Sequence, residues 1–385
     1  AGFFIVGAQV QYQLIQTQIQ LNEFVEQIRN KPLLAIDTEF MRRRTLYPEV
    51  ALIQVYDGEH LALIDPLAEL SLFDFWEILR DESVLKILHS PSEDIEVFQK
   101  YAGFVPSPLF DTQFALQLLG HGNCMGFAHM VKSLLDIEID KSESRTNWLQ
   151  RPLTKSQLDY AAADVFHLLP CFDIIIKQIN ASSYFELVIN ESNLVAQKRA
   201  YQTPDELLYK DIKNAWQLKP SELVVLKELA AWRKNKAIRK NLALNFVLKE
   251  HNLVEIAKRK PTSLNALRNI PEVENIEVNR SGVEVLKCIE KAKVVPVSDY
   301  PEQLKRLIDF PTYKKAAKDI KQTITKVAKE QGIPEDVMAS KKQINQLISW
   351  NWKLTPEQRK THLKPDLLNS WRYEYLKDVL KEWDV

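Results

Sequence analysis

The hydrophobic pattern of this 385-residue chain changes near residue 180. Before that point, short apolar runs typical of strands alternate with amphipathic stretches typical of helices. The expected strands are KPLLAID at 31–37, VALIQVYD at 50–57, HLALIDP at 60–66 and VLKILH at 84–89, and the expected helices include 22–30 and 71–81. The DGE turn between the second and third runs indicates a hairpin. This alternation predicts one α/β domain over residues 1–180.

The rest of the chain is predicted to be helical, because no later segment shows the convincing two-residue alternation of a strand. Residues 181–216 are expected to form a helical connecting arm, and all-α bundles are expected at 217–297 and 298–385. The VVPVSDYP stretch separates the two bundles, since prolines interrupt helices.

Charge is divided unevenly between the two parts, although the whole chain has no net charge. Residues 1–180 contain 24 acidic and 14 basic side chains, whereas residues 181–385 contain 27 acidic and 37 basic side chains. The excess of basic side chains in the C-terminal part indicates attraction to a polyanion. For any single helix, an ordinary solvated face explains the same pattern.

Composition excludes several classes of protein. A hydrophobic fraction of 45% with 26% charged residues is typical of a folded globular chain rather than a disordered one. The three cysteines are scattered singly, without the spacing of a zinc knuckle or a disulfide framework. The apolar start AGFFIVG lacks the basic flank of a signal peptide, and no apolar run reaches the roughly 18 residues of a membrane span. We therefore expect a cytoplasmic protein without a membrane partner.

The D-T-E triplet at the end of the first long apolar strand places two carboxylates together. Asp37 and Glu39 are two residues apart, so on a strand their side chains point to the same face. Like charges held this close repel each other unless a cation neutralises them, and a divalent metal ion is the natural partner. Such triplets are also frequent at exposed strand ends.

Two further segments carry candidate site residues. In HSPSED (89–94), a helix is expected to begin near Ser92, and Glu93 and Asp94 are also what a helix start favours for structural reasons. In YAAAD, Tyr160 and Asp164 are four residues apart and share one helix face. A carboxylate on a face that packs against a sheet needs a partner, commonly a metal ion.

Together these segments supply four carboxylates from three distant parts of the chain. Oxygen donors without a His or Cys pattern fit Mg²⁺ or Mn²⁺ better than zinc. Two such ions about 4 Å apart are a known arrangement for phosphodiester hydrolysis.

The motifs DTEF, HSPSEDIEVF and YAAADV resemble the three exonuclease motifs of the DEDD superfamily, in the subclass with Y-x-x-x-D. The linking sequence, including TLYPEVALIQVYDGEHLALIDPL and FDTQ, is similar to that of the bacterial ribonuclease D family. QLKPSELVVLKELAAWRKNKA and IAKRKPTSL resemble an HRDC domain, and ASKKQINQLISWNWKL resembles the second, divergent HRDC-like domain of that family. The resemblance implies an RNase H-like mixed sheet flanked by helices, followed by two all-α HRDC-type bundles.

The resemblance also implies roles for individual residues. Asp37, Glu39, Asp94 and Asp164 would hold two divalent ions, Mg²⁺ or Mn²⁺, and Tyr160 would orient the attacking water. The expected activity is a metal-dependent 3′→5′ exoribonuclease that releases nucleotide 5′-monophosphates. The expected substrates are the 3′ ends of precursor tRNAs and other small structured RNAs, and no obligate protein partner is inferred.

Residues next to the first motif are candidates for substrate binding. Phe40 and Met41 are expected to pack against the terminal base, since single strands are bound by stacking as well as by charge. Arg42, Arg43 and Arg44 are expected either to contact substrate phosphates or to form a solvated loop. Asp111 either lies near the site or caps a helix, and His89 is expected to be structural.

Three other functions compete with this interpretation. A DNA proofreading or repair exonuclease would use the same carboxylates, because none of them reads the 2′-hydroxyl group. A nucleic-acid-binding protein without activity would be expected to lack at least one carboxylate, and all four are present. A helicase is excluded by the absence of a G-x-x-x-x-G-K-[ST] loop.

Overall fold

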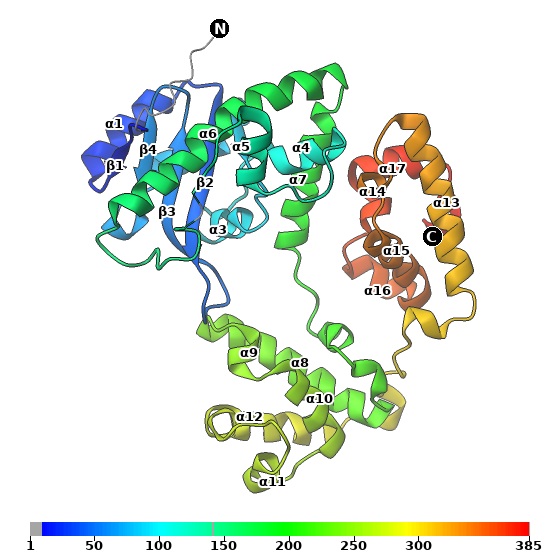
Figure 1. The fold of residues 1–385 in the computed structure, drawn as a ribbon. Helices are drawn as coiled ribbons and strands as arrows, with labels where there is room; N and C mark the ends of the chain where they lie inside the picture. The colour runs from blue at the N-terminus through cyan, green and yellow to red at the C-terminus, as the bar shows by residue number, and fades with distance from the viewer. Residues whose placement is uncertain (1–9, 141, 385) are drawn as a thin grey trace.

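The computed structural model describes residues 10–140 and 142–384 (Figure 1), so the apolar start AGFFIVG lies outside the described residues. Six strands form one mixed sheet: β1 Gln13–Ile15, β2 Leu33–Met41, β3 Glu49–Tyr56, β4 Leu61–Ile64, β5 Leu85–Leu88 and β6 Leu109–Asp111. Their order across the sheet is β1-β4-β3-β2-β5-β6. β3 runs antiparallel to both β2 and β4, whereas β5 runs parallel to both β2 and β6. The predicted hairpin over the DGE turn is therefore confirmed.

Helices cover both faces of this sheet. One face packs against α1 Gln18–Ile28, α2 Phe73–Arg80 and α3 Asp94–Tyr101, which share a core with apolar residues of β2 to β5. The other face packs against α4 Thr112–Leu118, α5 Phe127–Leu135 and the long α6 Lys155–Ala181. Because α6 contacts β2, β3, β4 and β5, any residue on its inner face lies close to the centre of the sheet.

Several predicted boundaries were wrong. β1 and β6 were missed, because three residues are too few to show a strand pattern and the prolines of VPSPLFD indicated a break. The first helix begins at Gln18 and not at residue 22, with Thr17 as its N-cap. α3 begins at Asp94 and not near Ser92, because a turn occupies residues 91–93. The Ser92 hydroxyl accepts a hydrogen bond from Arg199 instead of capping the helix.

The C-terminal part is helical, as predicted, and Figure 1 shows two separate groups of helices beside the α/β domain. The first bundle contains α8 Pro220–Lys240, α9 Leu244–Val247, α10 Glu250–Arg259, α11 Leu264–Arg268 and α12 Asn275–Lys293. The second bundle contains α13 Tyr313–Gln331, α14 Glu335–Met338, α15 Lys341–Lys353, α16 Pro356–Thr361 and α17 Ser370–Leu376. No helix within 10–140 or 142–384 has both the length and the hydropathy that crossing a membrane requires.

α7 Phe185–Ala200, within the predicted connecting arm, packs on two sides. It contacts β6 and α3 of the α/β domain, and it also contacts α17 of the second bundle. Trp371 Nε1 donates to Glu191 Oε2 on α7 at 2.8 Å, and Lys198 Nζ lies 2.8 Å from Asp366 Oδ2. The second bundle is therefore joined to the α/β domain through a shared apolar core, which extends from the α6 face to Trp371.

The first bundle touches the α/β domain through the loop that follows β2. The backbone N–H of Ala243 donates to the carbonyl of Arg44 at 2.7 Å, and the N–H of Tyr47 donates to Asn241 Oδ1 at 3.2 Å. The Arg44 guanidinium also lies over the Phe246 ring, 5.8 Å from its centroid. Figure 1 shows this loop reaching from the sheet to α9.

A partly buried ion pair between Arg151 and the buried Asp65 fixes the start of α6 on the sheet. Arg151, in the loop before α6, contacts both oxygens of Asp65 at 2.7 and 2.8 Å. The same guanidinium donates to the carbonyl of Ala51 on β3 at 2.6 Å and to that of Trp148 at 2.7 Å. These contacts tie β3, the end of β4 and the approach to α6 together.

Replacing Arg151 with Met should lower the free energy of unfolding by roughly 3 kcal/mol, because the buried Asp65 carboxylate would lose its charged partner. Urea unfolding followed by circular dichroism measures the change. Arg29→Met is the matched control, since Arg29 pairs with Glu26 on the surface and its replacement should leave the free energy of unfolding nearly unchanged. Equal effects of the two substitutions would contradict a structural role for the Arg151 contacts.

Candidate active site

The centre of the sheet carries the first pair of predicted site residues. Asp37 and Glu39 both lie on β2, where Asp37 is paired with Gln54 of β3 and Glu39 with Leu52. Because residues two apart on a strand share a face, both carboxylates point toward α6. The strand continues to Met41, so the two acids lie within it and not at its exposed end.

α6 brings the third motif onto these acids. Ala161 and Ala162 are fully buried, which lets the helix approach the sheet closely. Tyr160 and Asp164 lie one turn apart on the helix, close enough for the Asp164 charge to add to burial in raising the pKa of the phenol. Asp37, Glu39 and Asp164 each offer a carboxylate oxygen, and these oxygens lie within 4.8 Å of one another.

Asp94, the first residue of α3, reaches the same region from the other side of β2. Its carboxylate is buried and accepts a hydrogen bond from the Thr38 hydroxyl. Thr38 separates Asp37 from Glu39, so this contact fixes Asp94 beside the acidic pair. Glu93, its neighbour, is solvent-exposed. The structure thus brings Asp37, Glu39, Asp94 and Asp164 together, while their catalytic roles stay predictions.

The four carboxyl groups strongly disfavour being charged at once. Burial raises the pKa of Asp37 well above its ordinary value, and the charges of Asp94, Asp164 and Glu39 raise it further. Burial and the neighbouring Asp164 and Asp94 raise the pKa of Glu39 to about 9. Burial raises the pKa of Asp164 to about 7 and that of Asp94 to about 6.

These residues fit divalent cations by the chemistry of their donors. All four candidates offer carboxylate oxygen, which is the ligand that Mg²⁺ and Mn²⁺ prefer. Neutralising cations would remove the repulsion that raises the pKa values, because each ion interacts favourably with every ionised carboxylate around it.

Gln54 is a polar residue of the site region that sequence reasoning missed. It is fully buried on β3 directly opposite Asp37, so both side chains lie on the same face of the sheet. Among the residues that the structure describes, neither amide atom of Gln54 has a hydrogen-bond partner. A buried amide without a partner is costly, and next to Asp37 it adds a polar group where an ion and its water would lie. A glutamine inside the apolar run VALIQVY was the available signal.

A pocket of about 230 Å³ opens over the carboxylates. Its acidic floor is formed by Asp37, Glu39 and Asp164, together with Tyr160, and its other lining residues are His89, Phe127, Ala128, Ile139, Ser144 and Leu168. The apolar wall therefore comes largely from α5 and the segment that follows it, and not from the residues next to β2. No signal in the sequence linked that segment to the site.

The predicted stacking residues Phe40 and Met41 lie at the end of β2. Phe40 is half-buried and packs against the core under α1 to α3, on the face opposite to the acids. Met41 is also half-buried and packs at the edge of the α6-side core. Contact of either residue with a substrate base stays a prediction.

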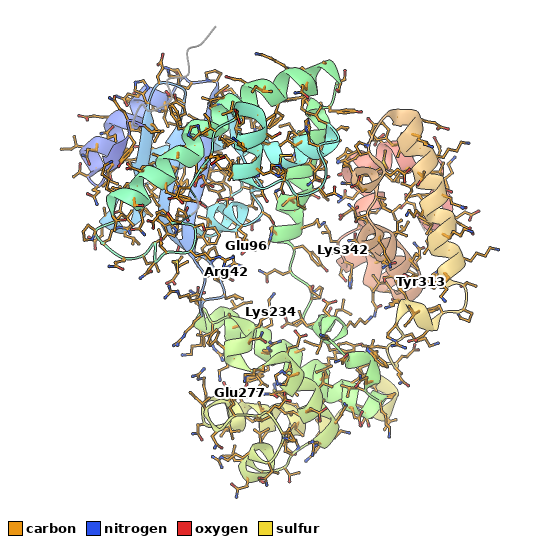
Figure 2. The ribbon with its side chains drawn as sticks, in the orientation of Figure 1. Arg42, Glu96, Lys234, Glu277, Tyr313 and Lys342 are labelled. Atoms are coloured by element: carbon orange, nitrogen blue, oxygen red, sulfur yellow. The ribbon has the colours of Figure 1, made fainter. Side chains whose placement is uncertain are left out.

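The three arginines after β2 have different surroundings. Arg42 forms an ion pair with Glu96 of α3, and Figure 2 shows the two side chains next to each other. Arg199, at the end of α7, pairs with the same Glu96 carboxylate. Arg43 is exposed, and Arg44 lies against Phe246 of the first bundle. Their contact with substrate phosphates is untested.

His89 and Asp111 have structural partners. His89 Nδ1 lies 3.0 Å from the Thr112 hydroxyl, and Nε2 lies 2.9 Å from the carbonyl of Met125, so the ring supports the loop before α5. Asp111 caps α4 by accepting from the N–H of Gln113 at 2.8 Å. The helix-cap interpretation of Asp111 is therefore confirmed, whereas His89 has structural partners and also lines the active-site pocket.

Comparison with known proteins extends this geometry to function. The family model described as a 3′-5′ exonuclease matches residues 12–180. The model of the HRDC domain matches residues 222–289, and that of the ribonuclease D C-terminal HRDC domain matches residues 311–380.

Relatives match the chain over nearly its whole length. Ribonuclease D of Escherichia coli K12 is 42% identical over 369 residues, which are 96% of this chain and 97% of that protein. Ribonuclease D of Cronobacter turicensis is 41% identical over 368 residues, which are 96% and 98% of the two chains. The crystal structure of Escherichia coli RNase D, described as an exoribonuclease involved in structured RNA processing, covers 97% of this chain and 98% of its own with a TM-score of 0.90 and 41% identity. The predicted fold class and resemblance are confirmed.

The raised carboxyl pKa values predict how the ion-free protein responds to pH. Between pH about 4 and about 7, folded Asp164 holds a proton that unfolded Asp164 has released, so the free energy of unfolding falls as pH rises. Asp164→Asn removes this titration and should stabilise the ion-free protein by roughly 2–4 kcal/mol at pH 8, with no gain near pH 4.

Urea unfolding in EDTA at several pH values tests this expectation. Asp159→Asn is the control on the same helix, because Asp159 lies near the surface and pairs with Lys155. That substitution removes a surface ion pair and should not stabilise the protein. If the free energy of unfolding depended on pH in the same way for the parent and for Asp164→Asn, the repulsion among the carboxylates would be contradicted.

Proposed function

Because the chain belongs to the ribonuclease D family and is a 3′–5′ exoribonuclease that acts in RNA processing, we propose that it cleaves RNA at the site formed by Asp37, Glu39, Asp94, Tyr160 and Asp164. The observation that carries this assignment is the convergence of Asp37, Glu39 and Asp164 oxygens within 4.8 Å on the inner face of α6. Asp94, held by Thr38, supplies the fourth carboxylate.

The four carboxylates would hold two divalent cations, Mg²⁺ or Mn²⁺. When bound, such ions lower the pKa of water and neutralise charge on the phosphate and on the leaving 3′-oxygen. The protein contributes position, since β2, α3 and α6 hold the carboxylates in a buried cluster that does not need to reorganise during the reaction.

Tyr160 is suited to orienting the attacking water. Burial and the neighbouring charges of Asp164, Glu39 and Asp37 raise the pKa of its phenol, so the hydroxyl stays protonated at neutral pH. A protonated phenol does not act as a base, but it holds a water molecule by hydrogen bonding. Tyr160 lines the same pocket as Asp37, Glu39 and Asp164, so its hydroxyl lies beside the carboxylates.

The pocket beside the carboxylates would receive the terminal nucleotide. Phe127, Ile139 and Leu168 offer an apolar wall against which a base can pack, whatever its identity. Phe40, Met41 and Arg42, Arg43 and Arg44 remain candidates for contact with the rest of the strand. The released product would be a nucleotide 5′-monophosphate.

Precursor tRNA 3′ ends are the proposed substrates, with other small structured RNAs. The Escherichia coli relative is described as an enzyme of structured RNA processing, and the basic C-terminal part of this chain suits a large polyanion. We further propose a cytoplasmic location and no obligate protein partner. The domain limits 1–180, 181–216, 217–297 and 298–385 are kept as a proposal, although α7 packs on its neighbours more than a free arm would.

Asp164→Asn should lower the rate of cleavage by about 1,000-fold or more. RNA affinity should change less than about threefold, because the carboxylate serves the chemical step more than the binding of the strand. Tyr160→Phe should lower kcat by about 10- to 1,000-fold with little change in KM. Single-turnover digestion of 5′-labelled RNA and anisotropy binding measure the two effects. Asp159→Asn should keep full activity, and an active Asp164→Asn enzyme would refute the site assignment.

Activity should disappear in EDTA and return with Mg²⁺ or Mn²⁺, because the carboxylates need a cation to bind a phosphate. Digestion of matched 5′-labelled RNA and DNA strands, and of a hairpin with a 3′ overhang, should show a ladder that shortens from the 3′ end of RNA. Chromatography of the products should give 5′-monophosphates. Endonucleolytic fragments, or activity without a divalent ion, would contradict the proposal.

A further inference from the structure

A second and larger pocket lies at the junction of the two bundles, with a volume of about 890 Å³. It is formed by the segment before α8, by the segment between the two bundles with the start of α13, and by α15 and α16. In Figure 1 the green segment before α8 and the yellow segment before α13 approach each other at this place. All of its lining residues lie between 209 and 358, so it is separate from the carboxylate site.

Aromatic rings form much of the wall of this junction pocket. The Arg306 guanidinium lies over the Trp216 ring at 4.1 Å from its centroid, so this ring already accepts a flat cation on its face. Phe310 and Trp352 form a second pair, with centroids 5.3 Å apart. Tyr313, labelled in Figure 2, also lines the pocket and is oriented by a 2.9 Å hydrogen bond to Asn345.

Cationic side chains lie between these rings. Lys210, Lys305, Arg306 and Lys353 line the pocket, whereas Glu302 is its one acidic lining residue. Arg306 pairs with Asp309. Neither Lys210 nor Lys353 forms an ion pair with any residue that the structure describes, and Lys210 only donates to Gln358 at 3.2 Å.

The two unpaired lysines point to an anionic ligand. Partial burial lowers the pKa of Lys210, while the charges of Asp211 and Glu302 raise it and the smaller effect of Lys353 lowers it. Desolvation also lowers the pKa of Lys353, against the attraction of Asp309. An anion bound between them would give both partly desolvated ammonium groups a direct partner, as a phosphate does for a cluster of lysines.

The combination of rings and cations favours RNA over a protein ligand. An acidic peptide would satisfy the lysines but offers a flat group to the Trp216 and Phe310 rings only where it carries an aromatic residue, whereas each nucleotide supplies both a base and a phosphate. We propose that the junction pocket binds a nucleotide of the single-stranded RNA upstream of the 3′ end, with its base on the aromatic wall and its phosphate near Lys210 and Lys353. This inference rests on the proposed function, because the pocket would bind an upstream part of the same RNA whose 3′ end lies at the carboxylate site.

The pocket would therefore discriminate substrates by length. A short RNA that reaches only the carboxylate site gains nothing from it, whereas a longer strand gains one stacking contact and one or more phosphate contacts. Loss of such a stacking contact typically weakens binding by roughly 5- to 100-fold.

Binding to the full-length Asp164→Asn protein tests the proposal without cleavage. Fluorescence anisotropy would use single-stranded RNAs of about 6 and about 24 nucleotides, spanning the usual site sizes of single-strand binders. Trp216→Leu and Lys353→Glu should each weaken binding of the long RNA at least about fivefold and leave the short RNA within about twofold. For the long RNA, Lys353→Glu should also reduce the slope of log binding constant against log salt concentration by about the amount that one phosphate contact contributes.

Lys326→Glu is the matched control, because Lys326 is an exposed lysine of α13 in the same bundle, outside the lining of the pocket. Lys305→Glu is a second pocket variant. Lys305 is an exposed lining residue, so its replacement should not affect folding and should weaken binding of the long RNA only. The proposal is overturned if the pocket variants bind long RNA as the control does, or if short and long RNA weaken equally. Digestion of the 6-nucleotide RNA by the protein with an intact Asp164 reports separately on the proposed function.

Discussion

Repulsion among buried carboxylates is the constraint that the α/β domain has to overcome. Asp37, Glu39, Asp94 and Asp164 come from two helices and one strand. Besides burial, the negative charges of Asp94 and Asp164 raise the pKa values of Asp37 and Glu39, so ionising all four groups at once is unfavourable. The domain holds them in place with contacts that do not involve a cation. The buried alanines of α6 bring the helix onto the sheet, Thr38 fixes Asp94, and Arg151 ties the approach of α6 to β3 and β4. These contacts thus offset the loss of stability that the carboxylate cluster causes. Such an arrangement is often found at active sites.

The parts of this site that follow local periodicity could be predicted from the sequence. Alternation on a strand placed Asp37 and Glu39 on one face, and helix spacing placed Tyr160 beside Asp164. The sheet strands of ordinary length were predicted, whereas three-residue β1 and β6 were too short to show a pattern. The start of α3 was misplaced, because Ser92 has the chemistry of a cap but binds Arg199, more than a hundred residues away.

Features that depend on long-range contacts could not be predicted in the same way. Arg42 follows a catalytic strand, yet its partner Glu96 is fixed only when α3 packs beside β2. The apolar wall of the active-site pocket comes from α5, which has no sequence motif. The junction pocket combines three segments that are far apart in sequence, so neither its aromatic pairs nor its unpaired lysines form a recognisable local pattern.

The loop between β2 and β3 gives the molecule a mechanical property. The first bundle is linked to the α/β domain by the chain that leaves α7 and by two hydrogen bonds to this loop, in which the N–H of Ala243 donates to the Arg44 carbonyl and the N–H of Tyr47 donates to Asn241 Oδ1. The loop that makes these hydrogen bonds continues directly into the strand of Asp37 and Glu39. A displacement of the first bundle by bound RNA would therefore be transmitted to the catalytic acids through the backbone between Arg44 and Glu39. These about five residues span at most about 17 Å.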